Sequence, residues 1–300
     1  MPLAVGTIIA GRYEVRQSLG RGGVGEVYEA RQIETGQLVA LKLLHPYVRQ
    51  DEAIHKRFQR EARAAGLIAS PYVARVLALI DDAAEGPAIA FELLRGETLH
   101  DRLRRVPRLP PREVDLLVSQ GLRGLHDAHA AGVVHRDLKP ANIFLEQQPG
   151  VPFGVKLLDF GISKLAETLV TPLTRPQQSL GSLSFMPPEQ FERAALVDHR
   201  ADLYALGTVV FRVLTGELPY PSSTLSELLT RKRHDAPRSL ASVGLPLDPA
   251  LESWMARMIA RDPSARFGSA AEALAAWFAL PPPFEVAPTS VPPPSAPASV

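Results

Sequence analysis

The chain of 300 residues contains no cysteine, and this absence excludes several kinds of chemistry at once. Disulfides, thiolate zinc sites, iron–sulfur clusters and a cysteine nucleophile all require the thiol that is missing. The absence also fits a reducing compartment.

Long apolar runs and a bias of charge are missing as well. No run approaches the roughly 18 residues that a membrane-spanning helix needs, and the N-terminus lacks the basic stretch of a signal peptide. The 33 basic and 32 acidic residues leave a net charge of +1, which favours neither a nucleic acid nor a membrane surface as a partner. Because 46% of the residues are hydrophobic, the chain can bury a sizeable core. We expect a cytoplasmic protein.

Residues 281–300 differ from the rest in composition. They hold eight of the 28 prolines, and Glu285 is their only charged residue. Such a segment cannot bury enough apolar surface to offset the entropy of ordering, so we expect a disordered or polyproline-like linker. This leaves open a membrane or sensor domain beyond Val300, in which case the chain is the cytoplasmic part of a longer, membrane-attached protein.

Two halves follow from the hydrophobic periodicity. Alternating or continuous apolar runs predict strands in the first 93 residues, and spacings of three and four predict helices, mostly after Gly96. A β-rich half followed by an α-rich half indicates an α+β protein with two lobes and a cleft between them. The predicted strands are Tyr13–Leu19, Gly25–Gln32, Leu38–Leu44, Ala74–Ile80 and Ala88–Leu94. The predicted helices are Asp51–Ala69, Thr98–Arg105, Pro111–Ala131, Asp202–Thr215, Leu225–His234, Pro249–Ala260 and Ala270–Leu280.

A glycine-rich turn lies between the first two predicted strands. Gly20–Gly25 has the pattern G-x-G-x-x-G, whose glycines let backbone N–H groups approach phosphate oxygens. An ordinary hairpin turn explains the pattern equally well. Because a strand follows, and not a helix, a dinucleotide-binding site is disfavoured.

Lys42 ends the apolar run Val39–Leu41. A lysine there either extends its amine to solvent or is buried with an acidic partner. Glu61 on the predicted helix is the favoured partner. Glu52 is the alternative, but it lies at the helix start, where the helix dipole already favours a carboxylate.

The most specific motif is the run His135–Asn142, with the sequence HRDLKPAN, followed after an apolar strand by Asp159-Phe160-Gly161. Two carboxylates and an amide oxygen on adjacent loops can hold magnesium and orient a hydroxyl. Each piece alone could be a capped turn. Their joint occurrence, in order, after a glycine turn and a strand lysine, is very improbable by chance.

With these motifs the sequence resembles the eukaryotic-like protein kinase family, and most of all the bacterial Ser/Thr kinases. The resemblance covers residues 9–280 and implies the bilobal kinase fold, with a β-rich N-lobe containing one helix (about 9–93) and a mainly helical C-lobe (about 94–280). Further matching phrases are Gly161–Lys164, Gly181–Gln190, Asp202–Gly207 and Arg261–Phe267.

The resemblance also implies roles for single residues. Asp137 would orient the substrate hydroxyl and accept its proton, and Lys139 would steady the γ-phosphate. Asn142 and Asp159 would hold Mg²⁺. Lys42, paired with Glu61, would hold the α- and β-phosphates of ATP. The expected nucleotide-binding residues are Leu19, Gly20, Gly22, Gly25, Val27, Ala40, Lys42, Phe91, Glu92, Leu94, Phe144 and Asp159, with Phe91 as gatekeeper, Glu92–Leu94 as hinge and Phe144 beneath the adenine. Glu189 is expected to pair with Arg266.

The residues between Asp159 and Glu189 form the family's activation segment. Arg136 precedes the catalytic aspartate and can pair with a phosphate there. The candidate phosphorylation sites are Thr174, then Thr171, with Ser179 and Thr168 further candidates. Ser182 stands where the family usually has threonine, and Pro187 where it usually has alanine, so the substrate-docking loop is expected to differ slightly.

The sequence thus predicts an ATP- and Mg²⁺-dependent Ser/Thr protein kinase that acts on protein substrates and on its own activation segment. Lys139 favours Ser/Thr over Tyr. A pseudokinase acting as a scaffold or allosteric module, and a small-molecule phosphotransferase, are the alternatives. A homodimer for autophosphorylation is left open, and no nucleic-acid partner is expected. His126 and His129, three apart on a predicted helix, are expected to be satisfied core or helix-end histidines, and Arg231–His234 a solvated helix end.

Overall fold

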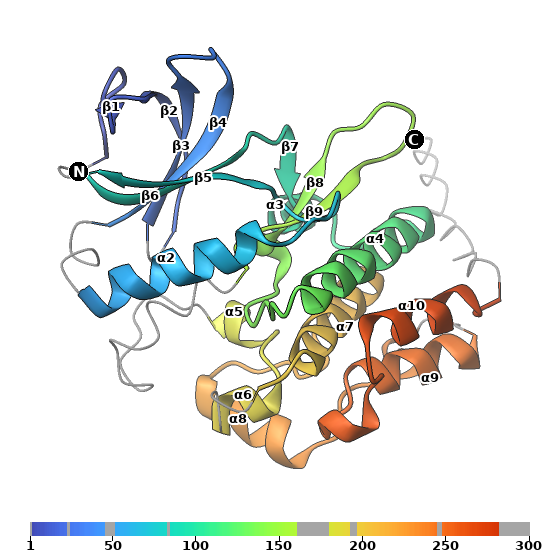
Figure 1. The fold of residues 1–300 in the computed structure, drawn as a ribbon. Coiled ribbons are helices and arrows are strands. Elements are labelled where there is room, and N and C mark those ends of the chain that lie inside the picture. Colours follow the sequence, from blue (N-terminus) through green and yellow to red (C-terminus); the bar gives the residue numbers. More distant parts are fainter. Residues whose placement is uncertain are drawn as a thin grey trace, which may run out of the picture.

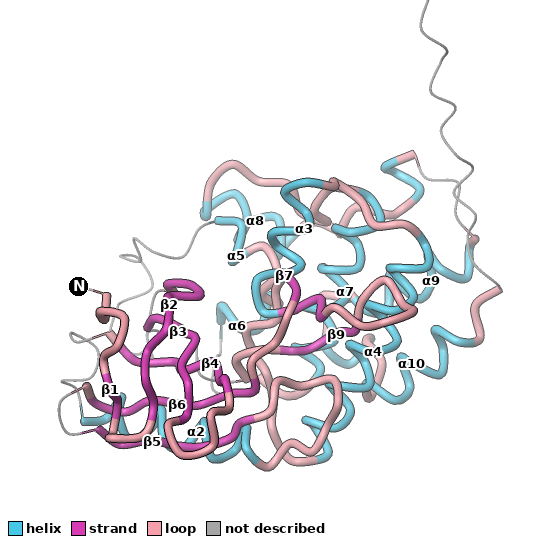
Figure 2. Tube along the Cα trace, turned by 90° about the horizontal axis from the view of Figure 1, so that it is seen from above, coloured by secondary structure: helices cyan, strands magenta, loops and turns pink. Residues whose placement is uncertain are grey.

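The computed structural model describes residues 2–22, 25–45, 52–82, 85–160, 180–192, 197–244 and 248–281, without the side chains of residues 52–55, 57, 61 and 192. Two lobes are visible in Figure 1, one a sheet with a helix beside it and the other a larger body of helices. Viewed from above, most strands gather in one lobe and most helices in the other (Figure 2). The predicted α+β fold with two lobes is confirmed.

The N-lobe is built on one antiparallel sheet. In spatial order its strands are β1 (Ile8–Ile9), β2 (Tyr13–Arg21), β3 (Gly25–Gln32), β4 (Leu38–Leu44), β6 (Gly86–Glu92) and β5 (Val76–Asp82). The helix α2 (Glu52–Gly66) runs beside this sheet (Figure 1).

The two faces of the sheet are buried differently, because successive side chains of a strand point to opposite sides. On one face Tyr28, Leu41 and Ala90 belong to a fully buried cluster. On the other face Ile89 packs against Phe58 of α2. The helix therefore covers the part of this second face around Ile89.

The strands β5 and β6 are displaced from their predicted positions. Strand β5 begins at Val76, two residues late, because Val73 and Ala74 pair with Leu157 of the other lobe, with the Ala74 N–H donating to the Leu157 carbonyl at 2.9 Å. Strand β6 spans Gly86–Glu92 where 88–94 was expected. Because Asp82 lies opposite Gly86, the connection between the two strands is shorter than the apolar runs predicted.

The C-lobe is organised around one buried helix. Helix α7 (Arg200–Thr215) has 14 buried residues among its 16, so it is enclosed on all sides, and α4, α9 and α10 belong to the same apolar cluster. The other helices are α3 (Leu99–Arg105), α4 (Pro111–Ala130), α5 (Leu180–Leu183), α6 (Pro188–Glu192), α8 (Leu225–His234), α9 (Pro249–Met258) and α10 (Ala270–Phe278). Short 3₁₀ turns occupy Pro140–Asn142, Ala241–Val243 and Pro263–Ala265.

A second, three-stranded sheet of β7 (Gly96–Thr98), β8 (Ile143–Glu146) and β9 (Gly154–Leu157) lies between the N-lobe and α4 (Figure 1). Among the described residues, no helix combines the length and apolar character needed to cross a membrane.

The prediction of a solvated end for α8 is wrong at one position. Arg233 and His234 are exposed, but Lys232 retains only 1% of its accessible surface. Lys232 follows Leu228 by four residues and therefore lies on the same, inward face of the helix. The helical periodicity places Lys232 on the buried face of α8, which the run of basic residues by itself does not indicate.

Two helix-interior glycines provide a test of the packing around α7. A Cβ on Gly207 would lie 2.7 Å from the Met258 Cβ, whereas a Cβ on Gly121 would meet the Leu206 side chain at 3.5 Å, an ordinary contact. We expect Gly121→Ala to raise the free energy of unfolding by up to about 1 kcal/mol through helix propensity. Gly207→Ala should lower it by roughly 1–2 kcal/mol, because overpacking outweighs the same propensity gain. Urea denaturation of both variants measures this, and shifts of the same sign would contradict the packing described.

Candidate active site

One face of the N-lobe sheet brings together four predicted nucleotide-binding residues. Val27 lies opposite Lys42, and Ala40 opposite Phe91. Opposed residues of antiparallel strands, and residues two apart on one strand, point to the same side. All four side chains are half-buried, whereas Leu41 between them is fully buried on the other face. The four residues therefore share the face that α2 leaves partly open.

The glycine-rich turn is held close to β4. A Cβ on Gly25 would lie 2.0 Å from the Leu43 carbonyl oxygen, so only glycine allows this approach. The Gly22 N–H donates to the Gly25 carbonyl at 2.8 Å, and the His45 ring nitrogen lies 2.8 Å from the Gly22 carbonyl. The tip of the turn, residues 23 and 24, is outside the described residues. Exposed positions at the end of β2 carry two more predicted residues, Leu19 and Gly20.

The amine of Lys42 lies 2.6 Å from the carboxylate of Asp159. Asp159 follows β9 with a left-handed backbone, φ 57°. Burial by itself raises the pKa of this carboxyl, but the charge and hydrogen bond of Lys42, with smaller effects of His135 and Lys139, hold the pKa below its ordinary value. Glu61, the predicted partner of Lys42, has a side chain outside the described set, so that pairing stays a prediction.

The loop that carries Asp137 is anchored on Asp202, which is fully buried in the first turn of α7. Its two carboxylate oxygens accept the backbone N–H groups of His135 and Arg136, each at 2.8 Å, and one of them also lies 2.8 Å from the His129 ring. Burial by itself raises the pKa of Asp202. The hydrogen bond and charge of His129, followed by the charge of His135 and the Arg136 N–H, outweigh burial, so the pKa lies below its ordinary value.

The same anchoring explains two histidines. His129, expected to be a satisfied histidine, is satisfied at one ring nitrogen only: its Nε2 lies 2.8 Å from Asp202, whereas its Nδ1 is buried without a hydrogen-bond partner within the described residues. His135 is fully buried, with its ring 2.8 Å from the Leu158 carbonyl and tilted against the Phe160 ring at a centroid distance of 4.6 Å and an interplanar angle of 50°. The His135 ring therefore connects the loop of Asp137 to the segment that follows β9.

The carboxylate of Asp137 is contacted by two neighbouring polar side chains. The Lys139 amine donates to its Oδ2 at 2.7 Å, and the Asn142 amide nitrogen donates to the same oxygen at 3.0 Å. A second hydrogen bond from Asn142, to the Asp137 carbonyl at 2.8 Å, fixes the curvature of the loop.

Asn142 and Asp159 can supply oxygen ligands to a divalent cation. The Leu158 N–H donates to the Asn142 carbonyl at 2.9 Å, which brings the residue before Asp159 onto the loop of Asn142. Because the Asn142 amide nitrogen faces Asp137, its oxygen is the atom that remains for a ligand. A carboxylate and an amide oxygen suit a hard cation such as Mg²⁺. Within the described part of the chain, no three His, Cys, Asp or Glu side chains come together as a possible metal site.

The predicted hinge follows β6. The Glu92 carboxylate accepts the Lys156 amine at 2.7 Å and the Arg75 N–H at 3.0 Å, which fixes the strand end. Leu94 lies in the connection that follows. Phe144 on β8 is half-buried and close to Gly96, where a Cβ would meet the Phe144 ring at 3.1 Å.

The comparisons with known proteins agree with this geometry. The family model of the protein kinase domain matches residues 13–278. The chain belongs to the protein kinase family. Members of this family use ATP and a divalent metal ion, and the bilobal kinase fold predicted for this chain is confirmed.

Bacterial kinases are among the most similar relatives. Serine/threonine-protein kinase pkn3 of Myxococcus xanthus is 38% identical over 271 residues, covering 89% of this chain and 49% of the relative. Serine/threonine-protein kinase pkn2 of the same organism is 35% identical over 284 residues, covering 90% and 33%. The chain thus spans half or less of the length of these curated relatives. The crystal structure of the Mycobacterium tuberculosis PknI kinase domain has a TM-score of 0.71 at 30% identity, covering 92% of this chain and 97% of that one.

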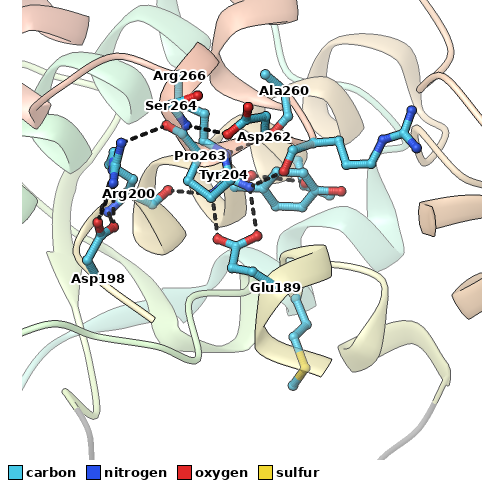
Figure 3. A network of polar contacts seen from close by, with 12 residues as sticks. Glu189, Asp198, Arg200, Tyr204, Ala260, Asp262, Pro263, Ser264 and Arg266 are labelled. Atoms are coloured by element: carbon cyan, nitrogen blue, oxygen red, sulfur yellow. Dashed lines mark hydrogen bonds and ion pairs between the residues drawn. The ribbon is translucent and has the colours of Figure 1, made fainter. Parts of the chain in front are cut away.

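The structure also contains the Glu189–Arg266 ion pair expected from the kinase resemblance. Both guanidinium NH₂ groups of Arg266 reach Glu189, at 2.7 and 2.8 Å, and the buried guanidinium also donates to three backbone carbonyls. Figure 3 shows Glu189 extending from α6 to Arg266, next to the Asp198–Arg200 pair. The candidate phosphorylation sites Thr168, Thr171, Thr174 and Ser179 lie outside the described residues.

Sequence reasoning missed the role of Asp202. The signal was present, since an aspartate opens the apolar helical run Leu203–Leu214. Aspartate is almost never fully buried unless it is paired, so donors from elsewhere in the chain had to reach it.

The Asp202 anchor predicts a pH-dependent contribution to stability. A carboxyl whose pKa is lowered on folding stabilises the native state above its unfolded pKa, about 3.9, and loses this contribution as the pH falls through the folded value. We expect Asp202→Asn to cost about 3 kcal/mol of unfolding free energy at pH 7, with the difference from wild type shrinking below about pH 4. Asp198→Asn, at the more exposed pair with Arg200, should cost at most about 1 kcal/mol. Urea denaturation at several pH values measures this. If the difference in unfolding free energy between wild type and Asp202→Asn did not change with pH, the proposed contribution of the Asp202 charge would be wrong.

Proposed function

We propose that this chain is an ATP-dependent Ser/Thr protein kinase, which transfers the γ-phosphoryl group to protein hydroxyls. The observation that carries the proposal is the placement of Asp137, with Lys139 and Asn142 hydrogen-bonded to one carboxylate oxygen. A carboxylate held in this way can accept the proton of a hydroxyl with its other oxygen.

Phosphoryl transfer depends mainly on positioning and on neutralising charge. Asp137 orients the acceptor hydroxyl and takes its proton. Lys139, whose amine already lies 2.7 Å from Asp137, supplies a positive charge for the transferred phosphoryl group. Lys42 supplies a second positive charge on the sheet face that also carries Val27 and Ala40, which would cover the adenine.

Asn142 and Asp159 would hold Mg²⁺, which neutralises phosphate charge when bound. Asp159 is suited to this because the charge of Lys42 keeps its carboxyl ionised. The expected approach of the adenine edge to the Glu92–Leu94 backbone, with Phe144 beneath, completes the proposed nucleotide site.

The two alternatives predict different residues. A pseudokinase module would be expected to lack Lys42, Asp137 or Asp159, and all three are present with mutually consistent contacts. A small-molecule phosphotransferase usually lacks the Lys139 pattern and the segment Gly181–Glu189. Lys139 also favours Ser/Thr over Tyr acceptors.

We infer protein substrates, no nucleic-acid partner, a cytoplasmic location and residues 9–280 as the catalytic unit. A homodimer, and a membrane or sensor domain beyond residue 300, stay open.

We infer that activation uses phosphorylation of the activation segment. The Arg136 Nε is buried without a hydrogen-bond partner within the described residues, and one of its NH₂ groups donates to the Val197 carbonyl at a long 3.4 Å. A guanidinium whose N–H groups are only partly hydrogen-bonded can bind a phosphate, which carries about −1.5 to −2 charges.

The first test of function is the substitution of Asp137. Asp137→Asn should lower phosphate transfer to a generic protein substrate by roughly 10²–10⁴-fold, because the proton acceptor is lost, while ATP binding is retained. Asp235→Asn, at an exposed position at the end of α8, is the matched control and should leave turnover unchanged. Transfer by Asp137→Asn at the wild-type rate would refute the assignment.

A second test addresses activation. Phosphate mapping by mass spectrometry of the purified chain should find phosphate within residues 168–179, with Thr174 as the main site, and none on Asp137→Asn. The Thr171→Ala/Thr174→Ala double variant should be slower than wild type but active. Phosphates found only elsewhere would exclude the Arg136-coupled mechanism.

A further inference from the structure

Lys232 is a buried cation that the proposed chemistry does not use. Its Nζ donates to the carbonyl of Ser184 at 2.9 Å and also to the carbonyl of Met186. Lysine is almost never fully buried unless it is paired. Here two backbone oxygens take the place of a carboxylate partner, since within the described residues no acidic side chain lies within ion-pair distance of this amine.

Three aromatic rings complete the surroundings of the amine. Nζ lies 5.2 Å from the ring centroid of Tyr204, 5.7 Å from that of Phe191 and 6.0 Å from that of Tyr220. Aromatic faces attract a desolvated ammonium. The rings come from α7, α6 and the segment before α8, so the amine is the point at which these three elements meet.

The charged and titratable groups around Lys232 are few. Burial lowers the pKa of its amine to about 7, with Glu189 raising it and Arg266 lowering it. Burial also raises the pKa of Tyr204 and Tyr220, so both phenols are neutral at pH 7. The cost of burying the ammonium is therefore offset chiefly by the two carbonyls and the aromatic faces.

The two carbonyls belong to the wall beside the catalytic aspartate. Ser182, Phe185, Met186 and Pro187 line a small hollow together with Asp137. Because these residues lie next to Asp137, we expect a polypeptide whose hydroxyl reaches Asp137 to run beside them. The backbone carbonyls of Ser184 and Met186 thus point to Lys232. Other atoms of the same segment lie beside Asp137, where the acceptor polypeptide is expected.

We propose that Lys232 is a positioning residue for the polypeptide substrate, whose buried ammonium holds the backbone of residues 184–186 in the shape that receives the acceptor chain. This inference rests on the proposed kinase function. Leu183, Tyr220 and Leu228 also pack together and attach the segment to α8, but apolar contacts are not directional, whereas two hydrogen bonds to carbonyls determine where the backbone lies. Lys232 acts through this backbone and touches neither substrate.

The test separates the two substrates kinetically. For Lys232→Met, which keeps the length of the side chain but has no donor, we expect the KM for myelin basic protein to rise about tenfold or more, because two buried carbonyls lose their donor. The KM for ATP should stay within about twofold, since no nucleotide-binding residue contacts Lys232. A KM for myelin basic protein within twofold of wild type would overturn the proposal.

Two controls exclude simpler explanations. Arg231→Met removes the same charge from the exposed side of α8 and should change neither KM. Leu251→Ala, equally buried but on α9, lowers stability without touching residues 184–186. If Leu251→Ala raised the KM for myelin basic protein as much as Lys232→Met does at a similar loss of Tm, the role of Lys232 would be only structural.

A second pair of variants covers the case in which Lys232→Met fails to fold. Tyr220→Leu removes one aromatic face and Tyr220→Phe retains it, so only Tyr220→Leu should raise the KM for myelin basic protein, by about threefold. Equal values for the two variants would contradict the proposal.

A readout without catalysis separates this inference from the proposed function. Amide hydrogen exchange in residues 180–192 should be faster in Lys232→Met than in wild type and unchanged in Arg231→Met. If wild type does not phosphorylate any protein, the proposed function fails, and the exchange result still decides whether Lys232 holds this segment. Unchanged exchange in Lys232→Met would overturn the inference in either case.

Discussion

The carboxylate of Asp202 is the contact on which the arrangement of the site depends. It lies in the first turn of a helix enclosed by the apolar core, where the helix dipole favours its negative charge although burial opposes it. From there it accepts the backbone N–H groups of His135 and Arg136. Since Asp137 is the next residue, its location is set by an interaction with the buried helix α7, and a loop with little secondary structure of its own acquires a defined shape.

Among the residues that the structure describes, the half-buried Lys42 and the buried Arg266 and Lys232 are stabilised in three different ways. Lys42 is paired with Asp159; in the proposed function Asp159 would exchange the amine for a metal ion, and Lys42 would exchange the carboxylate for a phosphate. Arg266 has a carboxylate, Glu189, together with three backbone carbonyls, and its fixed planar geometry suits a permanent joint. Lys232 has carbonyls and aromatic rings only. The Lys42–Asp159 pair, which can exchange partners, lies in the proposed site. Arg266 and Lys232 hold the segment around Glu189 in place.

The contacts between the lobes converge on one short stretch around β9. Leu157 pairs with Val73, Lys156 reaches Glu92, and Asp159 reaches Lys42. These polar contacts accompany an apolar one, because Ala65, Ile68 and Val73 of the N-lobe belong to the same buried cluster as the C-lobe helices.

The sequence by itself indicated the family, the main strands and helices in their order, and the candidate site residues, but it did not predict β1, β7, β8, α5 and α6. Local information suffices for what it did indicate, because the motif His135–Asn142 and the periodicity of the strands and helices are written in consecutive residues. It located β5 and β6 only within two residues, since the pairing of Val73 with Leu157 and the tight connection at Asp82 and Gly86 involve partners that the local pattern does not contain.

Only the tertiary structure decided which charges are buried and what they contact. Arg231–His234 is a uniform basic run in the sequence, yet Lys232 alone is enclosed, because it shares a helix face with Leu228 and meets carbonyls 46 and 48 residues away. Asp202 likewise looks like an ordinary first-turn aspartate until the backbone of residues 135 and 136 reaches it. The free energy of a buried charge depends on all groups within a few ångströms of it, and those groups come together only when the chain has folded.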